Sequence, residues 1–135
     1  MELSEKERER LKRNIDIIEK KSFAQFATLI PDGSPHVSTV WIDHEDGTVL
    51  VNTAKGRQKD LNVRRDPRVS LCILDPDDPY RQLIIHGRVV DITEQGADDH
   101  IDKLANKYLG RERYPNRSPG EVREIIRIQP EEVIA

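Results

Sequence analysis

Six short strand-like segments, separated by turn signals or single helices, constrain the fold of this chain most strongly. Apolar and β-branched residues dominate the segments, while Gly, Pro, Asp and Asn gather between them, as is typical of antiparallel strands joined by tight turns. The segments predicted as strands are residues 23–30, 35–43, 48–53, 68–74, 81–92 and 121–129. The alternation of strand and helix found in doubly wound folds is absent. The pattern therefore predicts a mainly β protein with attached helices, built as a small antiparallel barrel.

Three further segments have helical periodicity. Residues 4–20 begin with Ser4 and Glu7, which have the form of a capping box, and continue with apolar residues at helical spacing. A second helix is predicted over residues 57–65, with its leucine on the inner face, and a third over residues 94–109.

Two of the predicted strands carry additional expectations. The near-continuous apolarity of residues 68–74 predicts a strand that is buried on both faces, with Cys72 as a buried structural thiol. Gly87, in the fifth strand, predicts a β-bulge or a close approach of two backbones.

The composition limits the class of protein. The chain has 135 residues and no linker rich in Gly, Pro or Ser, so we expect one domain, residues 1–135, with residues 1–20 as its N-terminal helix. Hydrophobic residues make up 36% and charged residues 35%, which predicts a modest core and a partner subunit that completes strand burial. The charged N-terminus and the absence of a long apolar run predict a soluble, cytoplasmic protein without a membrane partner.

The segment Thr53–Lys59 is the strongest candidate for a binding site. A predicted strand passes here into the N-terminus of a helix, where unpaired backbone N–H groups and the helix dipole favour an anion. Arg57 can make planar bidentate contacts, Lys59 carries a mobile charge, and Gly56 lets the backbone approach a ligand closely. The segment lacks Walker spacing but predicts a phosphate site, with a solvated cationic turn as the alternative.

Positive charge is concentrated around this turn. Residues 55–68 contain six lysines or arginines and two aspartates, although the whole chain has a net charge of −3. A local surplus suits an anionic small molecule. The overall acidity and the lack of interleaved aromatic residues argue against a nucleic-acid partner.

No other pattern predicts side-chain catalysis or a metal centre. The chain has four histidines, His36, His44, His86 and His100. They lack metal-ligand spacing, so we expect surface or strand-packing residues. The acidic residues 75–78 are expected in a solvated, proline-fixed loop over residues 75–80 rather than around a cation. We assign no catalytic residue, and a bound cofactor would explain why none is evident.

Four segments occur in a distinctive order and spacing: Pro35–Trp41, Asn52–Lys59, Arg65–Leu71 and Tyr80–Val89. Together they resemble the split β-barrel flavin-binding family of pyridoxamine 5′-phosphate oxidase. The Gly-Arg-x-Lys form of the phosphate turn is most similar to the branch that uses the deazaflavin coenzyme F420. The resemblance implies an FMN-binding type of split barrel with about six antiparallel strands, and a homodimer with two cofactor sites at its interface.

The resemblance also implies a set of cofactor-binding residues. By position, the backbone of residues 38–41 would run along the flavin-like ring, and Gln82 would reach its polar edge. Thr53 would join the two cations on the phosphate, and Tyr80 would come from the second subunit. The full set is Ser38, Thr39, Val40, Trp41, Asn52, Thr53, Lys55, Gly56, Arg57, Lys59, Tyr80 and Gln82.

The implied activity is that of an oxidoreductase in which reduced F420 passes a hydride to an unsaturated or conjugated small molecule. Oxidation of vitamin B6 is not expected, because the chain stops soon after Pro130. Two alternatives remain: an FMN-dependent oxidase or reductase of the same fold, and a non-catalytic module that binds a flavin, a deazaflavin or haem. Lys55, Arg64 and Arg65 would either accompany the polyglutamyl tail of F420 or form a solvated helix face.

Overall fold

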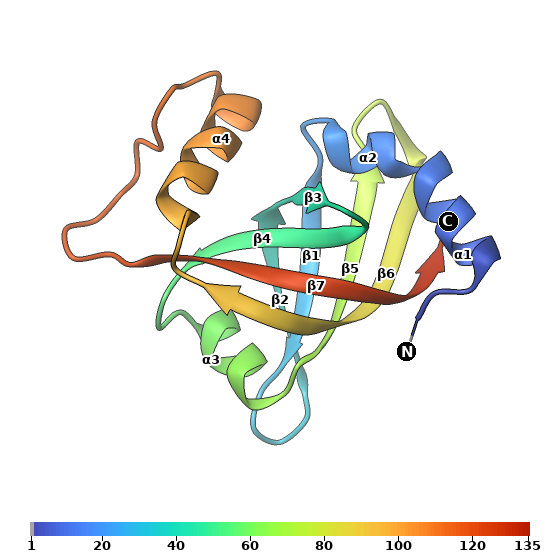
Figure 1. Ribbon diagram of the computed structural model, residues 1–135, viewed down its shortest axis with the longest axis horizontal. Helices are drawn as coiled ribbons and strands as arrows, with labels where there is room; N and C mark the ends of the chain where they lie inside the picture. The colour runs from blue at the N-terminus through green and yellow to red at the C-terminus, as the bar shows by residue number, and fades with distance from the viewer. Residues whose placement is uncertain (1) are drawn as a thin grey trace.

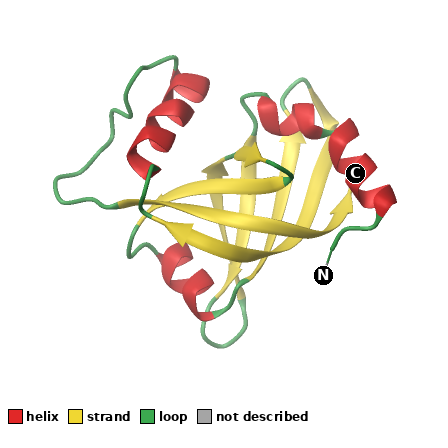
Figure 2. Cartoon of the chain, viewed as in Figure 1, coloured by secondary structure: helices red, strands yellow, loops and turns green. Residues whose placement is uncertain are grey.

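Seven strands and four helices make up residues 2–135, the part of the chain that the computed structural model describes (Figures 1 and 2). The strands are β1 (Phe23–Leu29), β2 (Pro35–Trp41), β3 (Asp43–Glu45), β4 (Thr48–Ala54), β5 (Arg68–Asp75), β6 (Asp78–Thr93) and β7 (Arg123–Ile134). The helices are α1 (Glu5–Arg13), α2 (Ile15–Glu19), α3 (Gln58–Arg65) and α4 (Ala97–Leu109). The predicted mainly β class with attached helices is confirmed.

The strands form one antiparallel sheet in the order β2-β1-β5-β6-β7-β4-β3. Its two edge strands, β2 and β3, are consecutive in the chain and are joined through Ile42, so the chain closes the sheet into a barrel. The long strand β6 makes this closure possible, because it pairs with β5 over residues 78–88 and with β7 over residues 84–93. A register shift lies at Gly87, where a Cβ atom would stand 2.6 Å from the carbonyl oxygen of Gln129. The predicted bulge is confirmed.

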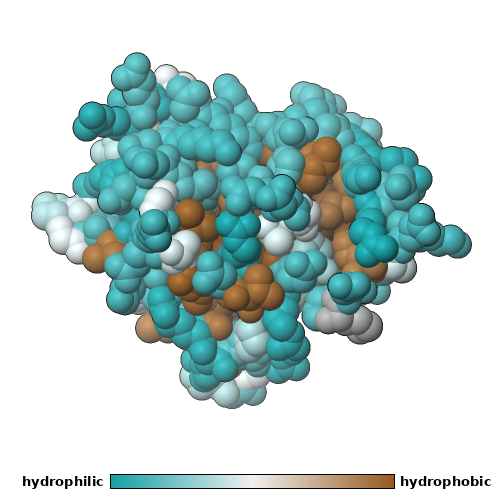
Figure 3. Space-filling view, in the orientation of Figure 1, coloured by the Kyte–Doolittle hydropathy of each residue, from teal (hydrophilic) through white to brown (hydrophobic). Residues whose placement is uncertain are grey.

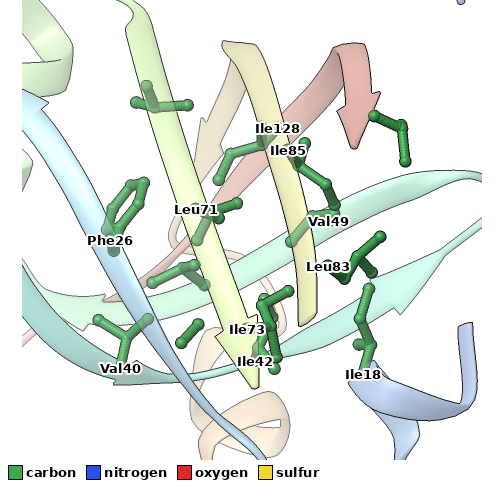
Figure 4. Packing of buried hydrophobic residues seen from close by; sticks show 14 of the residues in the cluster. Ile18, Phe26, Val40, Ile42, Val49, Leu71, Ile73, Leu83, Ile85 and Ile128 are labelled. Carbon is green, nitrogen blue, oxygen red and sulfur yellow. The ribbon is translucent and has the colours of Figure 1, made fainter. Parts of the chain in front are cut away.

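Apolar side chains from the long strands fill the barrel. Phe26 of β1, Leu71 of β5, Ile85 of β6 and Ile128 of β7 are buried, and Ile18 of α2 packs at one end (Figure 4). Each such side chain contributes about 1.5–3 kcal/mol through removal of its apolar surface from water. Because neighbouring residues of a strand point to opposite faces, the residues between these core positions point away from the barrel.

The prediction that residues 68–74 are buried on both faces is wrong. Burial alternates along β5, with Leu71 inside, Leu74 46% exposed and Cys72 only partly buried. An apolar run indicates that both faces of a strand are suited to burial. It does not show that the same chain covers both of them. The outer face of β5 ends in Cys72 and Leu74, and this apolar part is only partly covered in the single chain.

The predicted N-terminal helix is divided into α1 and α2. The capping box of Ser4 and Glu7 is confirmed, but the helix breaks at Asn14, whose side-chain amide donates a 2.8 Å hydrogen bond to the carbonyl oxygen of Arg10. Such a local bond competes with the backbone ladder of a helix. Residue 1 of the predicted segment lies outside the described residues.

The loop predicted over residues 75–80 is wrong. Residues 76 and 77 form a two-residue turn, and β6 begins at Asp78. Asp75 is buried at the end of β5, where its carboxylate accepts hydrogen bonds from Lys20 at 2.9 Å and Arg81 at 3.0 Å. Asp75 is therefore neutralised by cations of the chain, whereas Asp77 and Asp78 are exposed, as the predicted solvated turn requires.

Four smaller differences concern element boundaries and faces. The predicted strand over residues 35–43 divides at Ile42, which raises the strand number from six to seven. The last strand continues through Pro130, because proline is tolerated opposite the bulge at Gly87. In α3, Leu61 is exposed and Val63 is buried instead. The helix expected over residues 94–109 begins three residues later, at the start of α4.

The helices lie in two groups around the barrel. α3 and α4 lie at one end, with the end of β4 and the start of β7 between them, whereas α1 lies at the opposite end beside the C-terminus (Figure 1). The face in this view is largely hydrophilic, with apolar side chains gathered near its centre and on its right side (Figure 3). None of the helices in residues 2–135 is both long enough and apolar enough to cross a lipid bilayer.

Candidate functional site

A hollow of about 150 Å³ is formed by β2, β4, the start of α3, α4 and the start of β7. It is lined by Thr39, Val40, Trp41, Asn52, Arg57, Lys59, Ile101, Tyr114 and Arg123. The first six belong to the predicted set, and the last three do not. The barrel thus brings together the ring-binding strand and the phosphate turn that the sequence predicted as parts of one site.

A larger hollow of about 520 Å³ lies elsewhere, between α1 and the turn that joins β3 to β4. Leu3, Leu11 and Ile15 form its apolar wall, and none of the predicted site residues lines it. The smaller hollow is the better candidate, because convergent charges and aromatic rings, rather than volume, indicate a cofactor site.

The turn between β4 and α3 has the geometry of an anion site. Gly56 has a φ of +92°, a conformation that glycine adopts without strain, and its N–H donates a 2.7 Å hydrogen bond to the carboxylate of Asp60. Arg57 is the N-cap residue of α3, but its side chain makes no capping hydrogen bond. The first N–H groups of α3 therefore lack a side-chain cap and can contribute to the binding of an anion.

Three cations, Arg57, Lys59 and Arg123, line the hollow. Glu121 forms an ion pair with Arg123 and lies 3.8 Å from the guanidinium of Arg57. Lys59 is half-buried and has no ion-pair partner within residues 2–135. Its pKa is lowered by burial and then by the charges of Arg57 and Arg123. This unbalanced positive charge suits an anionic ligand.

Aromatic rings form a second wall. Trp41 stacks on Tyr108, with ring centroids 5.0 Å apart and planes at 5°, and meets Tyr114 edge to face at 5.9 Å. The guanidinium of Arg123 lies over the ring of Tyr114, 5.2 Å from its centroid. Burial raises the pKa of Tyr108 to about 12, so its hydroxyl stays protonated at neutral pH. A flat, partly charged wall of this kind can hold a planar ring system.

A buried hydrogen-bond network supports the floor of the hollow. Asn52 accepts a bond from Nε of Arg123 at 2.9 Å, and its amide nitrogen donates to the carbonyl of Ala97 at 2.9 Å. The same nitrogen lies 3.1 Å from Nδ1 of His100, whose Nε2 lies 3.0 Å from the carboxylate of Asp43. Contrary to the expectation for the histidines, His100 is a buried helix residue, 9% exposed, that belongs to this network.

Comparison with known families identifies the fold. Residues 12–135 match the sequence model of the family described as pyridoxamine 5′-phosphate oxidase. The chain belongs to the pyridoxamine 5′-phosphate oxidase family. The match covers nearly the whole barrel, and the split-barrel fold that the sequence predicted is confirmed.

Several solved structures superpose on this chain. An F420 reductase is 28% identical, with a TM-score of 0.77 over 88% of this chain and 94% of that one. A conserved hypothetical protein from Mycobacterium tuberculosis is 24% identical, with a TM-score of 0.69 over 97% and 82% of the two chains. The haem storage protein HutZ from Vibrio cholerae is 14% identical, with a TM-score of 0.65 over 92% of each chain. The last two similarities show the fold alone.

Four residues of the predicted cofactor-binding set do not line the hollow, although they lie near it or on the strands that form it. Gly56 shapes the turn, and Lys55 is exposed and pairs with Glu94 at 3.2 Å. Ser38 and Thr53 have buried side-chain oxygens for which no hydrogen-bond partner is found within residues 2–135. The structure therefore places a hydroxyl beside the turn, but not on the surface of the hollow.

Tyr80 and Gln82 are remote from the hollow of their own chain. Trp41 pairs with Phe23 across β2 and β1, and Leu74 pairs with Gln82 across β5 and β6. Gln82 is therefore three strands away from Trp41, about 14 Å at the usual strand spacing. Tyr80, near the start of β6, is 96% exposed. Neither side chain completes the hollow of the same chain.

Three residues that line the hollow were not predicted from the sequence. Arg123 reaches the hollow because β7 pairs with β4 and places it beside Ala54, a register that the sequence does not reveal. Tyr114 was the signal available, since it is a lone aromatic residue in a polar segment, residues 111–119. Ile101 lies within the helix predicted over residues 94–109, and its apolar side chain carries no signal of a binding site.

The cations beyond the turn are engaged within the chain. Arg64 bonds to Asp60 and to Glu124, each at 2.7 Å, and Arg65 donates to the carbonyl of Leu29. Arg64 and Arg65 are nevertheless exposed, as a solvated helix face predicts, and the contact with the polyglutamyl tail stays a prediction. Within residues 2–135, no group of three His, Cys, Asp or Glu side chains is arranged to hold a metal ion.

Proposed function

We propose that the protein binds the deazaflavin coenzyme F420 in this hollow and acts as an oxidoreductase on an unsaturated or conjugated small molecule. The observation that carries the proposal is the half-buried Lys59, which lacks an ion-pair partner within residues 2–135 and lies beside Arg57 and Arg123. A cofactor phosphate would supply the missing anion. The 28% identity to an F420 reductase supports the choice of a deazaflavin. A cytoplasmic location is part of the proposal, because the single cysteine can form no disulfide within the chain.

Each wall of the hollow has a role in this proposal. Arg57, Lys59 and the N-terminus of α3 bind the phosphate, while Trp41 and the backbone of β2 orient the ring. Tyr114 covers the site and helps to exclude water. When bound in its reduced form, the deazaflavin supplies the hydride. No acidic side chain is assigned to the substrate, whose proton can come from solvent.

Binding measurements test this function. We expect the purified protein to bind F420 with sub-micromolar affinity and FMN much more weakly, as followed by fluorescence titration. Replacing Arg57 and Lys59 together by alanine should weaken F420 binding by about a hundredfold or more, because charge-assisted bonds contribute about 1.5–3 kcal/mol each. Lys21→Ala, which removes an exposed cation outside the hollow, should leave affinity unchanged.

The other outcomes are equally informative. Tighter binding of FMN would favour the flavoprotein oxidase or reductase. Binding without turnover over a broad set of acceptors would favour a non-catalytic flavin, deazaflavin or haem module. Binding of neither F420 nor FMN, or an affinity for F420 that Arg57→Ala/Lys59→Ala leaves intact, would overturn the proposed site.

We also propose a homodimer formed through the outer face of β2, β1, β5 and the start of β6. Phe23 and Val37 are both 56% exposed there, beside the exposed Leu74 and Tyr80. A second copy on this face would bury these side chains and could bring its own Tyr80 to the hollow that the chain leaves incomplete.

Light scattering with size-exclusion chromatography tests this assembly. We expect a dimer for the wild-type chain and a monomer for Val37→Glu, because a carboxylate in an apolar interface is left without its hydration. Leu109→Glu, at an exposed apolar position on α4, should remain dimeric. A wild-type monomer at micromolar concentration would contradict the proposal.

A further inference from the structure

The buried network beneath the hollow is a continuous series of hydrogen bonds that links α4 to Arg123. Asp43 contacts His100, His100 contacts Asn52, and Asn52 accepts the Nε–H of Arg123, with atom separations of 3.0, 3.1 and 2.9 Å. One terminal nitrogen of Arg123 binds Glu121. Its other terminal nitrogen has no hydrogen-bond acceptor within residues 2–135 and remains available to a ligand in the hollow.

The chemistry of the donors fixes the orientation of each group. Arg123 can only donate, so the amide oxygen of Asn52 must face it. The amide nitrogen of Asn52 then faces His100 and can only donate, which makes Nδ1 of His100 an acceptor. Nε2 therefore carries the proton of the neutral imidazole, and this N–H donates a hydrogen bond to the carboxylate of Asp43. Every member of the network has a consistent role.

We propose that His100 is a positioning residue for the candidate cofactor site. Its Nδ1, together with the carbonyl oxygen of Ala97, holds the Asn52 amide in the orientation that presents oxygen to Arg123, and Arg123 is thereby aimed at the bound anion. This inference rests on the proposed function. His100 itself does not line the hollow and acts only through Asn52 and Arg123.

Asp43 keeps the imidazole in the required tautomer. Burial alone would raise the pKa of Asp43, but the bond from His100, the backbone N–H of His44 and the nearby Lys103 hold it well below its usual range. The carboxylate is therefore ionised near neutral pH and accepts the hydrogen bond from Nε2–H. Without it, the imidazole could place its proton on Nδ1 and face Asn52 with a second donor.

Two substitutions of His100 separate positioning from simple packing. Asparagine places an acceptor near the position of Nδ1, whereas glutamine places its amide near Nε2 and leaves the Asn52 amide with the carbonyl of Ala97 as its one remaining acceptor. We expect His100→Gln to weaken F420 binding about three- to tenfold, the usual effect of one lost hydrogen bond, and His100→Asn to stay within about twofold of wild type. Asp99→Asn, an exposed change on the same helix, is the matched control.

The melting temperature of each variant shows whether folding is affected. Equal losses of affinity in His100→Gln and His100→Asn that follow the melting temperature would overturn the proposal. Nitrogen-15 shifts of the imidazole give a readout that needs no cofactor. We expect the neutral Nε2–H tautomer in the wild-type protein, and an Nδ1–H tautomer would also overturn the proposal.

Inorganic phosphate separates this inference from the proposed function. If the wild-type protein binds neither F420 nor FMN, the proposed function fails, while phosphate still tests the cationic hollow. We expect His100→Gln to weaken phosphate binding, measured by chemical-shift titration of the amides of Gly56 and Lys59, and His100→Asn to preserve it. Phosphate affinity that His100→Gln leaves unchanged would refute the positioning role.

Discussion

Trp41 and Tyr108 form a parallel stack that connects one wall of the hollow to the point where the barrel closes. The ring planes are 5° apart, and the hydroxyl of Tyr108 accepts the backbone N–H of Ile42 at 3.1 Å and donates to the carbonyl of Ser22. Ile42 joins the two edge strands of the sheet. The position of the indole therefore depends on the same bonds that hold the barrel closed.

Tyr108→Phe should destabilise the protein by about 1–3 kcal/mol, because it keeps the stack but leaves two buried backbone groups without a partner. Urea unfolding can be followed through the fluorescence of Trp41, the single tryptophan. Asp99→Asn, an exposed change on the same helix, should be nearly neutral. Equal stability of both variants would show that the two backbone groups find other partners.

Gly56 and Gly87 should respond to alanine for different reasons. At Gly56 the φ of +92° imposes a backbone cost of about 1–2 kcal/mol, although nothing lies within 4 Å of the new Cβ. At Gly87 the Cβ would stand 2.6 Å from the carbonyl oxygen of Gln129, so the cost is a steric clash within the β6–β7 pair.

We therefore expect Gly87→Ala to lower the melting temperature more than Gly56→Ala, and Gly56→Ala to lower phosphate or cofactor affinity more than Gly87→Ala. Calorimetry and binding titration measure the two effects separately. The reverse order of affinities would contradict the assignment of the turn as an anion site.

Glu124 and Asp60 make stability depend on pH. Burial, together with the nearby Asp60 carboxyl, raises the pKa of Glu124 to about 7, while Arg64 binds both groups. A group whose pKa is raised on folding stabilises the protein fully below its unfolded pKa and loses that contribution as the pH rises through the folded value. The free energy of unfolding should therefore fall by about 1–3 kcal/mol between about pH 5 and pH 8.

Glu124→Gln tests this assignment, because the amide does not titrate. Urea unfolding at several pH values should show a flatter profile for the variant than for the wild type. The pKa of Asp60 is lowered despite its burial, and its contribution is lost only as the pH falls below the usual range of a carboxyl group. A wild-type profile that is already flat over this range would show that Glu124 is ionised throughout.

Local chemistry determined what the sequence could predict. The cationic turn between β4 and α3 was recognisable because strand, glycine and cations are consecutive, although its binding of phosphate stays a prediction, and the bulge at Gly87 was recognisable because glycine is unusual inside a strand. The division of the first helix at Asn14 was not, since it depends on one side-chain bond that competes with the backbone. Strong signals that act within a few residues can be read from the chain, whereas the outcome of a local competition between a side-chain bond and the helix backbone cannot.

Long-range register could not be read in this way. Arg123 and Asn52 lie 71 positions apart and meet only because β7 pairs with β4. In the sequence, His100 is one of four scattered histidines. Only the position of α4 in the fold places it beneath the hollow. The turn could thus be predicted from the sequence. The residues of other elements that support it could not, because they come together only in the closed barrel.

Asp102 anchors the segment that carries Tyr114 over the hollow. Its carboxylate accepts the backbone N–H of Tyr114 at 2.8 Å and a bond from Arg117 at 3.1 Å. Asp102→Asn keeps an acceptor for the N–H and loses only the exposed ion pair, which typically contributes less than about 1 kcal/mol. We therefore expect near wild-type cofactor affinity from Asp102→Asn, but an affinity about three- to tenfold weaker from Asp102→Ala. Hydrogen exchange should show faster opening of residues 111–119 in the alanine variant alone, and equal exchange in both variants would assign the anchor to Arg117 instead.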